Sequence, residues 1–169
     1  MQNQTRIIIE NVLPQLNNGS FAIKRIVGQK VTVTAEVFSD GHDVVESCVK
    51  FKHESEKNWS EVRMTHIQND EWHAEFHVQK QGKYTYFVEA WVDYALNWQH
   101  GTIRKINDNQ FVKSELLEGA EYIRAILNLV DASESAYLNR LIAYFITESE
   151  YDNAIRETKS EQLFEILKK

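Results

Sequence analysis

The organisation of the chain follows from one run in its middle, KYTYFVEAWVDYALNWQH, at residues 83–100. Read with a period of two, this run places Tyr84 and Tyr86 on one face and Phe87 and Trp91 on the other. Such alternation of aromatic and β-branched residues predicts a strand, and aromatic residues on both faces predict a strand covered on both sides. The sequence before this run reads as shorter strands, and the sequence after it reads as helix.

The first part of the chain predicts a sheet-rich domain. Short runs rich in β-branched and aromatic residues are separated by turn residues, and the cleanest alternation is at residues 71–78. Seven strands are expected, at residues 6–12, 21–27, 31–38, 44–53, 59–67, 71–78 and 83–93. Strands of this length and spacing are typical of an antiparallel β-sandwich of immunoglobulin type. We therefore expect such a sandwich over residues 1–105.

Composition changes near residue 101. All four tryptophans and all six histidines lie at or before His100. Beyond that point apolar residues recur every three or four positions, and Asp131 and Ser160 stand where N-caps of helices are expected. Short polar joints between such helices predict a small α-helical bundle over residues 106–169. Gly119 lies inside its first helix at a cost of about 1 kcal/mol relative to Ala, and close approach of another helix would explain it.

Charge and composition exclude several classes of partner. The net charge is −6, with −3 in residues 1–100 and −3 from residue 101 onward, so no basic stripe indicates nucleic acid. The apolar run at residues 7–9 is far too short for a signal peptide or a membrane span. The single cysteine, Cys48, excludes an internal disulfide and is compatible with a reducing compartment. We expect a soluble cytoplasmic protein with no nucleic-acid or membrane partner.

Two groups of polar residues suggest chemistry, and both have simpler explanations. His73, Glu75 and His77 share one face of a strand, which superficially resembles a metal site, but a solvent-facing strand surface is the favoured interpretation. A loop at residues 40–43, Asp40-Gly41-His42-Asp43, could coordinate a cation or contact a partner. A turn in which the aspartates bond local backbone amides is favoured. No metal site is therefore expected.

The tryptophans are the remaining candidates for binding. Trp72, Trp91 and Trp98 could stack on sugar rings, although core or domain-contact tryptophans are more frequent. Cys48 has the outward parity of Lys50 with no histidine neighbour indicated, so it is not expected to be a nucleophile. The sequence also lacks a glycine-rich phosphate loop, a Ser/His/Asp signature and a paired-cysteine motif. No catalytic residue and no cofactor is expected.

Three segments resemble the N-terminal region of bacterial α-1,4-glucan:maltose-1-phosphate maltosyltransferases, which belong to the α-amylase superfamily. They are RIIIENVLPQLNNGSFAIKRIVGQKV at residues 6–31, AEVFSDGHDVV at residues 35–45 and GKYTYFVEAWVDYALNWQH at residues 82–100. The last is the most specific, because it ends in a tryptophan followed closely by a histidine. Beyond it, the helical character and the ELLEGA run at residues 115–120 support the resemblance.

The resemblance implies a fragment of an enzyme. In this family the sandwich carries a helical insert, both contribute to a homodimer contact, and a following barrel of about 250 residues holds the catalytic carboxylates. The whole enzyme would transfer maltosyl units from α-maltose 1-phosphate to the non-reducing end of an α-1,4-glucan, with retention. This chain would be its inactive scaffold and dimerisation region, with one sandwich edge lacking its usual neighbour. A glucan-binding module and an autonomous immunoglobulin-like interaction domain are the alternatives.

Overall fold

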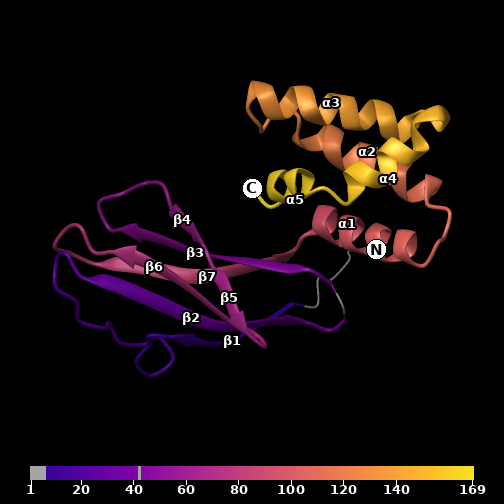
Figure 1. The fold of residues 1–169 in the computed structure, drawn as a ribbon. Helices are drawn as coiled ribbons and strands as arrows, with labels where there is room; N and C mark the ends of the chain where they lie inside the picture. The colour runs from indigo at the N-terminus through magenta and orange to yellow at the C-terminus, as the bar shows by residue number, and fades with distance from the viewer. Residues whose placement is uncertain (1–6, 42) are drawn as a thin grey trace, which may run out of the picture. The chain divides into compact units, whose positions relative to one another are not determined.

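A computed structural model describes residues 7–41 and 43–169 of the chain (Figure 1). The chain forms two units, residues 1–92 and residues 93–169. The first holds two antiparallel sheets and the second holds helices, as expected from the sequence. The expected boundary between residues 105 and 106 lies inside the first helix. Within the described ranges, no helix has the length and apolar character needed to cross a membrane.

The first sheet has four strands in the order β1-β2-β6-β5 (Figure 1). Their bounds are Ile7–Leu13, Lys30–Ser39, Glu71–His77 and Thr65–Gln68, in that order. In β2, valines and an alanine alternate with polar residues, and the four apolar side chains are buried: Val31, Val33, Ala35 and Val37. This period of two places one face of the sheet in the core.

The second sheet has the order β4-β3-β7, with bounds Ser60–Arg63, Val45–His53 and Tyr84–Val92. Val49 of β3 lies opposite both Val62 and Val88 and is completely buried. The rings of Phe51 and Phe76, one from each sheet, stack with centroids 4.3 Å apart. Both sheets therefore share one hydrophobic core, and the unit is a sandwich.

Two expected strands differ in the structure. Residues 21–27 form no strand; a single bridge joins Phe21 to Leu16, and a turn at residues 27–28, closed by the Gln29 N–H donating to the Ile26 carbonyl at 2.9 Å, leads into β2. The apolar residues there have the right types for a strand, but among residues 7–41 and 43–169 no neighbouring strand pairs with them. The run at residues 59–67 divides into β4 and β5, which belong to different sheets. Buried Met64 marks the division, and its N–H donates to the Ser47 carbonyl 2.9 Å away.

The run at residues 83–100 also divides, at Asp93. This residue caps α1 (Tyr94–Asn107), its carboxylate accepting a hydrogen bond of 2.8 Å from the Leu96 N–H. The helix begins earlier than expected because polar Gln99 and Thr102 occupy its buried face and conceal the helical period. Within the described residues, β7 is hydrogen-bonded to β3 alone and so forms an edge of its sheet.

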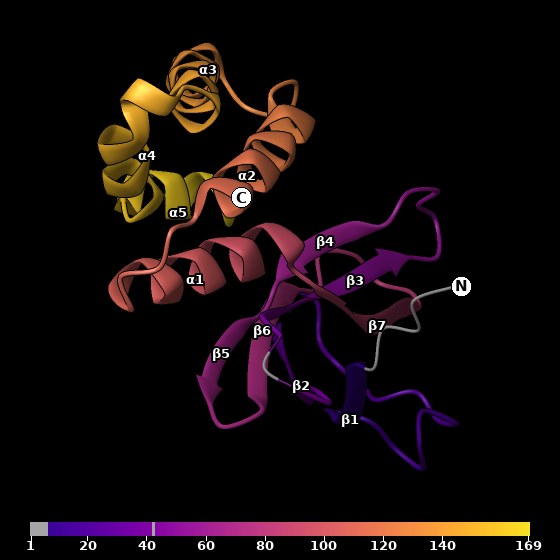
Figure 2. The same cartoon turned by 90° about the vertical axis from the view of Figure 1, so that its right-hand side faces the viewer.

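The second unit continues with four more α-helices, which surround a common interior together with α1 (Figure 2). They are α2 (Lys113–Ile126), α3 (Ala132–Ile146), α4 (Tyr151–Thr158) and α5 (Glu161–Leu167), and the 3-10 turn η1 (Glu148–Glu150) precedes α4. Asp131 caps α3 through the Ser133 and Glu134 N–H groups, and Ser160 caps α5 through Leu163. Both caps confirm the sequence prediction.

Gly119 of α2 lies directly against the ring of Trp98 from α1. A Cβ atom at this glycine would lie 1.9 Å from Trp98 Cζ2. Trp98 itself is only 6% exposed, and its indole N–H donates to the Glu115 carbonyl at 2.5 Å. The expected close approach at Gly119 is confirmed, and an indole ring makes it.

Candidate functional site

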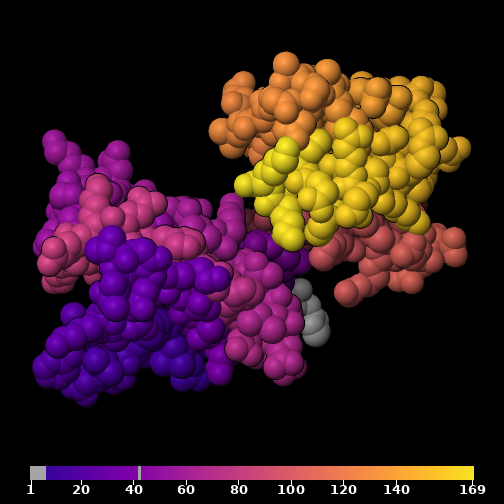
Figure 3. Space-filling view, turned by 60° about the vertical axis from the view of Figure 1, so that its left-hand side comes forward, coloured from indigo at the N-terminus to yellow at the C-terminus, as the bar shows by residue number. Residues whose placement is uncertain are grey.

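The most exposed apolar side chains of the first unit are concentrated in one segment, residues 13–30. Leu13, Leu16, Phe21, Ile26 and Val27 each expose between 50% and 70% of their surface. In Figure 3 the N-terminal segments, coloured indigo to purple, form part of the surface of the first unit. A group of large apolar residues at the surface is typical of an interaction site. We call this segment the extended segment.

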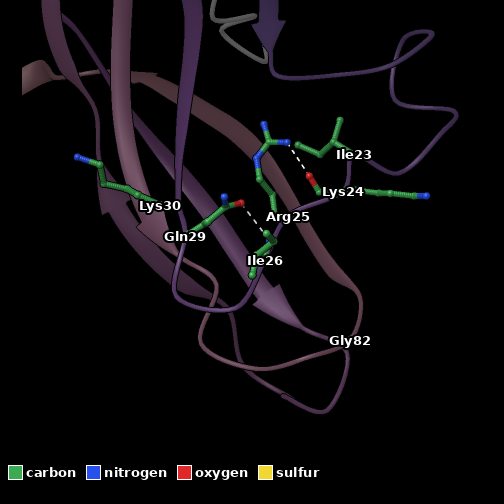
Figure 4. A pocket seen from close by; sticks show the side chains of 7 residues that line it. All are labelled: Ile23, Lys24, Arg25, Ile26, Gln29, Lys30 and Gly82. Atoms are coloured by element: carbon green, nitrogen blue, oxygen red, sulfur yellow. Dashed lines mark hydrogen bonds between the residues drawn. The ribbon is translucent and has the colours of Figure 1, made fainter.

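The extended segment borders an open hollow of about 990 Å³ (Figure 4). It is lined by Ile23, Lys24, Arg25, Ile26, Gln29, Lys30 and Gly82. The side chains of Lys24 and Lys30 point away from one another in Figure 4, and the Arg25 guanidinium donates to the Lys24 carbonyl at 2.8 Å. Because the three cations do not converge, the hollow is a positively charged surface concavity and does not resemble a built anion site.

A second surface lies on the outer side of the sheet β4-β3-β7. Trp59 and Phe87 meet edge to face with ring centroids 4.9 Å apart, and they are 41% and 40% exposed. Two cations lie over aromatic rings on the same side, Lys52 4.6 Å from the Trp59 centroid and Arg63 4.4 Å from the Trp91 centroid. We call this surface the outer aromatic face.

Charged side chains occupy the centre of the outer aromatic face. Lys50 forms ion pairs with Glu89 at 2.5 Å and Glu61 at 3.9 Å. Cys48 shares their side of the sheet by register, as the sequence predicted, but it is 0% exposed. Burial raises the pKa of the Cys48 thiol, and the carboxylates of Glu61 and Glu89 raise it further. The thiol is therefore poorly suited to act as a nucleophile.

The structure separates the three tryptophans that the sequence singled out. Trp72 is half-buried, and its indole N–H donates to the Val37 carbonyl at 3.2 Å. Trp98 lies in the helical core, so its ring has no free face for a sugar. Trp91 belongs to the outer aromatic face beneath Arg63. Sequence reasoning missed Trp59, although its spacing of two from Glu61 places it on the outward side.

The strand face with His73, Glu75 and His77 is occupied by local interactions. Glu75 accepts from Lys30 Nζ at 2.7 Å and from the Thr32 hydroxyl at 3.0 Å. The Lys30 ammonium is the first cause of the lowered pKa of Glu75, and the Thr32 hydroxyl is the second. Among residues 7–41 and 43–169, no group of three or more His, Cys, Asp or Glu side chains could hold a metal ion.

The loop at residues 40–43 is only partly described, because His42 lies outside the described residues. Gly41 has a φ of +146° and donates its N–H to the Ser39 carbonyl at 3.0 Å, so a glycine suits this bend. Asp40 and Asp43 are both exposed. Whether this loop contacts a partner stays a prediction.

Other carboxylates with a lowered pKa stabilise local structure. Lys105 lies 2.5 Å from Glu115 and is the main cause of the lowered pKa of that carboxyl. Lys80 does the same for Glu56 at 3.1 Å. Each of these acids therefore serves as the partner of a lysine in an ion pair.

Two sheets share one core and are followed by a cluster of helices, so the chain is a sandwich-and-helix module. The family model for domain N/S of alpha-1,4-glucan:maltose-1-phosphate maltosyltransferase matches residues 5–169. The chain belongs to this family, which confirms the resemblance seen in the sequence.

Individual relatives agree with the family match. The chain is 40% identical over 118 residues to the alpha-1,4-glucan:maltose-1-phosphate maltosyltransferase of Myxococcus xanthus, covering 68% of this chain and 18% of the relative. The enzyme of the same name from Chlorobaculum tepidum is 37% identical over 118 residues, covering 70% and 18%. That of Rhodospirillum rubrum is 29% identical over 154 residues, covering 85% and 22%. The chain thus spans about a fifth of the length of these relatives.

Proposed function

We propose that this chain is the non-catalytic N-terminal scaffold and dimerisation region of a cytoplasmic enzyme that transfers maltosyl units from α-maltose 1-phosphate to α-1,4-glucan. The observation that carries the proposal is the match of residues 5–169 to domain N/S of the maltosyltransferase family. The names of the relatives supply the donor and the acceptor. A reducing cytoplasm suits the single buried thiol of Cys48.

The extended segment supports a role in assembly. Its five exposed apolar side chains would leave water if a second copy, or the catalytic barrel of the longer protein, covered them. Phe21 and Ile26 are 65% and 70% exposed, and burying such side chains stabilises a complex by about 1.5–3 kcal/mol each. The three cations beside them, Lys24, Arg25 and Lys30, favour an acidic neighbouring surface.

The position of β7 at the edge of its sheet supports the same role. The orders β1-β2-β6-β5 and β4-β3-β7 correspond to strands A-B-E-D and C′-C-F of an immunoglobulin sandwich. In that fold a last strand, G, pairs with F, which corresponds to β7 here. We propose that the longer protein supplies this strand, since unpaired edges are normally covered. The outward-facing amides of β7 should then exchange with deuterium much more slowly in the longer protein than in this chain.

The absence of activity is tested with the chain as it is. Purified chain is incubated with α-maltose 1-phosphate and maltohexaose, and release of phosphate is measured. We expect none above the buffer blank. Turnover that survives repurification would refute a non-catalytic role.

Dimerisation is tested by sedimentation velocity at micromolar concentration. We expect the unmodified chain to sediment as a dimer and the double variant Phe21→Ser/Ile26→Ser to sediment as a monomer. Leu129→Ser is the matched control, because Leu129 is 81% exposed in the helical unit, and it should leave the dimer intact. A monomeric unmodified chain would show that dimerisation needs other parts of the protein.

A further inference from the structure

We infer that the outer aromatic face binds an α-1,4-glucan chain, with Trp59 and Phe87 as its stacking platform and Trp91 at its other end. This inference rests on the proposed function, which supplies the ligand class. It differs from the sequence-based candidates, because two of those tryptophans face inward and the two most exposed rings of this face were not among them.

The register of the three strands places these residues on one side. Phe87 of β7 lies opposite Lys50 of β3, which lies opposite Glu61 of β4. Glu46 and Trp91 form a further pair on the same side, two steps of the alternation away. The face is thus a strip with aromatic rings near both ends and charged side chains between them. A linear oligosaccharide offers the matching sequence of apolar ring faces and hydroxyl edges.

The charges of the strip favour an uncharged ligand rich in hydroxyl groups. Three cations stand beside three carboxylates, so the strip has no net charge: Lys50, Lys52 and Arg63 with Glu46, Glu61 and Glu89. An anionic or a cationic ligand would meet like charges as well as opposite charges along the strip, so neither sign is favoured. Sugar hydroxyls both donate and accept hydrogen bonds, so they can bond to ammonium, guanidinium and carboxylate groups alike.

The same ion pairs disfavour a protein partner on this face. A dry interface over the ion pairs of Lys50 with Glu89 and Glu61 would remove these charged groups from water. The free energy lost by desolvation then exceeds the gain in Coulombic attraction unless the geometry is excellent. Cores of stable protein interfaces are also depleted of charged residues. A sugar chain leaves much of this hydration in place. Lys52 lies over the Trp59 ring, yet Trp59 and Phe87 remain 41% and 40% exposed, and stacking on a sugar needs such exposed aromatic surface.

The experiment is a titration of the ¹⁵N-labelled chain with maltoheptaose, followed by the four indole N–H resonances. We expect the Trp59 and Trp91 signals to shift with a common saturation curve and a Kd on the order of 1 mM. The Trp72 and Trp98 signals should stay in place, because their N–H groups donate to the Val37 and Glu115 carbonyls inside the two units. Trp59→Ala assigns the Trp59 signal.

Matched phenylalanine variants test the platform. Phe87→Ala should weaken binding by about tenfold or more, judged from the Trp91 shift. Phe111→Ala, an identical change at a residue 76% exposed in the helical unit, should leave the Kd unchanged. Dispersed spectra identical outside the substituted region establish that both variants are folded. Cellohexaose is a β-1,4-glucan of different curvature. Recognition of the α-1,4 linkage predicts that it binds at least tenfold more weakly than maltoheptaose, a difference of about 1.4 kcal/mol in binding free energy.

Several results would overturn the inference. One is the absence of any shift of the Trp59 and Trp91 signals at maltoheptaose concentrations well above the expected Kd. Another is an equal loss of binding affinity in Phe87→Ala and Phe111→Ala. Concentration-dependent shifts of these signals without sugar would instead identify the face as a contact between copies. Glucan binding with phosphate release by the isolated chain would contradict only the non-catalytic role, whereas no binding by an inactive, dimeric chain would contradict only this inference.

Discussion

Replacing Gly119 by alanine tests the contact that joins α1 to α2. The new Cβ would lie 1.9 Å from Cζ2 and 2.4 Å from Cε2 of Trp98, whereas ordinary contact begins at 3.4 Å. The ring would therefore have to move by about 1.5 Å, the difference between 3.4 and 1.9 Å. It is held by its hydrogen bond to the Glu115 carbonyl and by the ring of Phe145, whose centroid lies 5.7 Å away.

The opposing effects can be compared. Overpacking a buried site costs about 1–3 kcal/mol, and losing the indole hydrogen bond adds about 1 kcal/mol. The gain in helix propensity from Gly to Ala returns about 1 kcal/mol. We expect Gly119→Ala to destabilise the helical unit by about 2 kcal/mol. With a urea dependence of about 1 kcal/mol per molar for a unit this small, the midpoint should fall by about 2 M.

Urea unfolding followed by circular dichroism at the helical minimum measures this change. Gly101→Ala is the matched control, because Gly101 lies in α1 and its Cβ would meet nothing within 4 Å. That variant should be more stable than the parent by up to about 1 kcal/mol. If Gly119→Ala were also stabilised, the ring of Trp98 could not be fixed against Gly119 and the packing argument would fail.

Two further predictions concern titratable groups. Folding lowers the pKa of Asp131, chiefly through the Ser133 hydroxyl, so its carboxylate stabilises the helical unit above its ordinary pKa and ceases to do so as the pH falls through the lowered value. The melting temperature of Asp131→Asn should therefore differ most from the parent near about pH 7 and approach it as the pH falls through the lowered pKa, and a constant difference would contradict this cap. Burial raises the pKa of Cys48, so the folded chain should not react with a disulfide reagent at neutral pH. The chain unfolded in guanidinium chloride should react fully. Rapid reaction of the folded chain would contradict the burial of this thiol.

The sequence predicted the elements whose pattern is local. Alternation in residues 31–38 and 71–78 identified β2 and β6, and the caps at Asp131 and Ser160 were readable because each serves its own helix. The first strand was placed correctly within its described residues. These features depend on neighbours close in the chain, so the residue types alone indicate them.

Features that depend on distant neighbours could not be predicted in this way. Residues 21–27 have strand-like composition, yet whether they pair is decided by which strands lie beside them. The helix at residue 94 was concealed because Gln99 and Thr102 fill buried positions where apolar residues were expected. Cys48 has outward parity but is completely buried in the three-stranded sheet, between β4 and β7, and periodicity does not reveal this burial.

The two faces of β7 show why this strand has aromatic residues on both sides. Tyr84, Tyr86 and Val88 pack against the sandwich core, so one face is explained by folding alone. On the other face Phe87 packs against Trp59, Trp91 lies beneath the cation of Arg63, and both keep solvent-exposed surface. Folding alone does not require large aromatic residues on a face that remains partly wet, because threonine or lysine would serve there. A ligand or a covering partner would account for them, and the neutral, ion-paired surroundings favour the ligand.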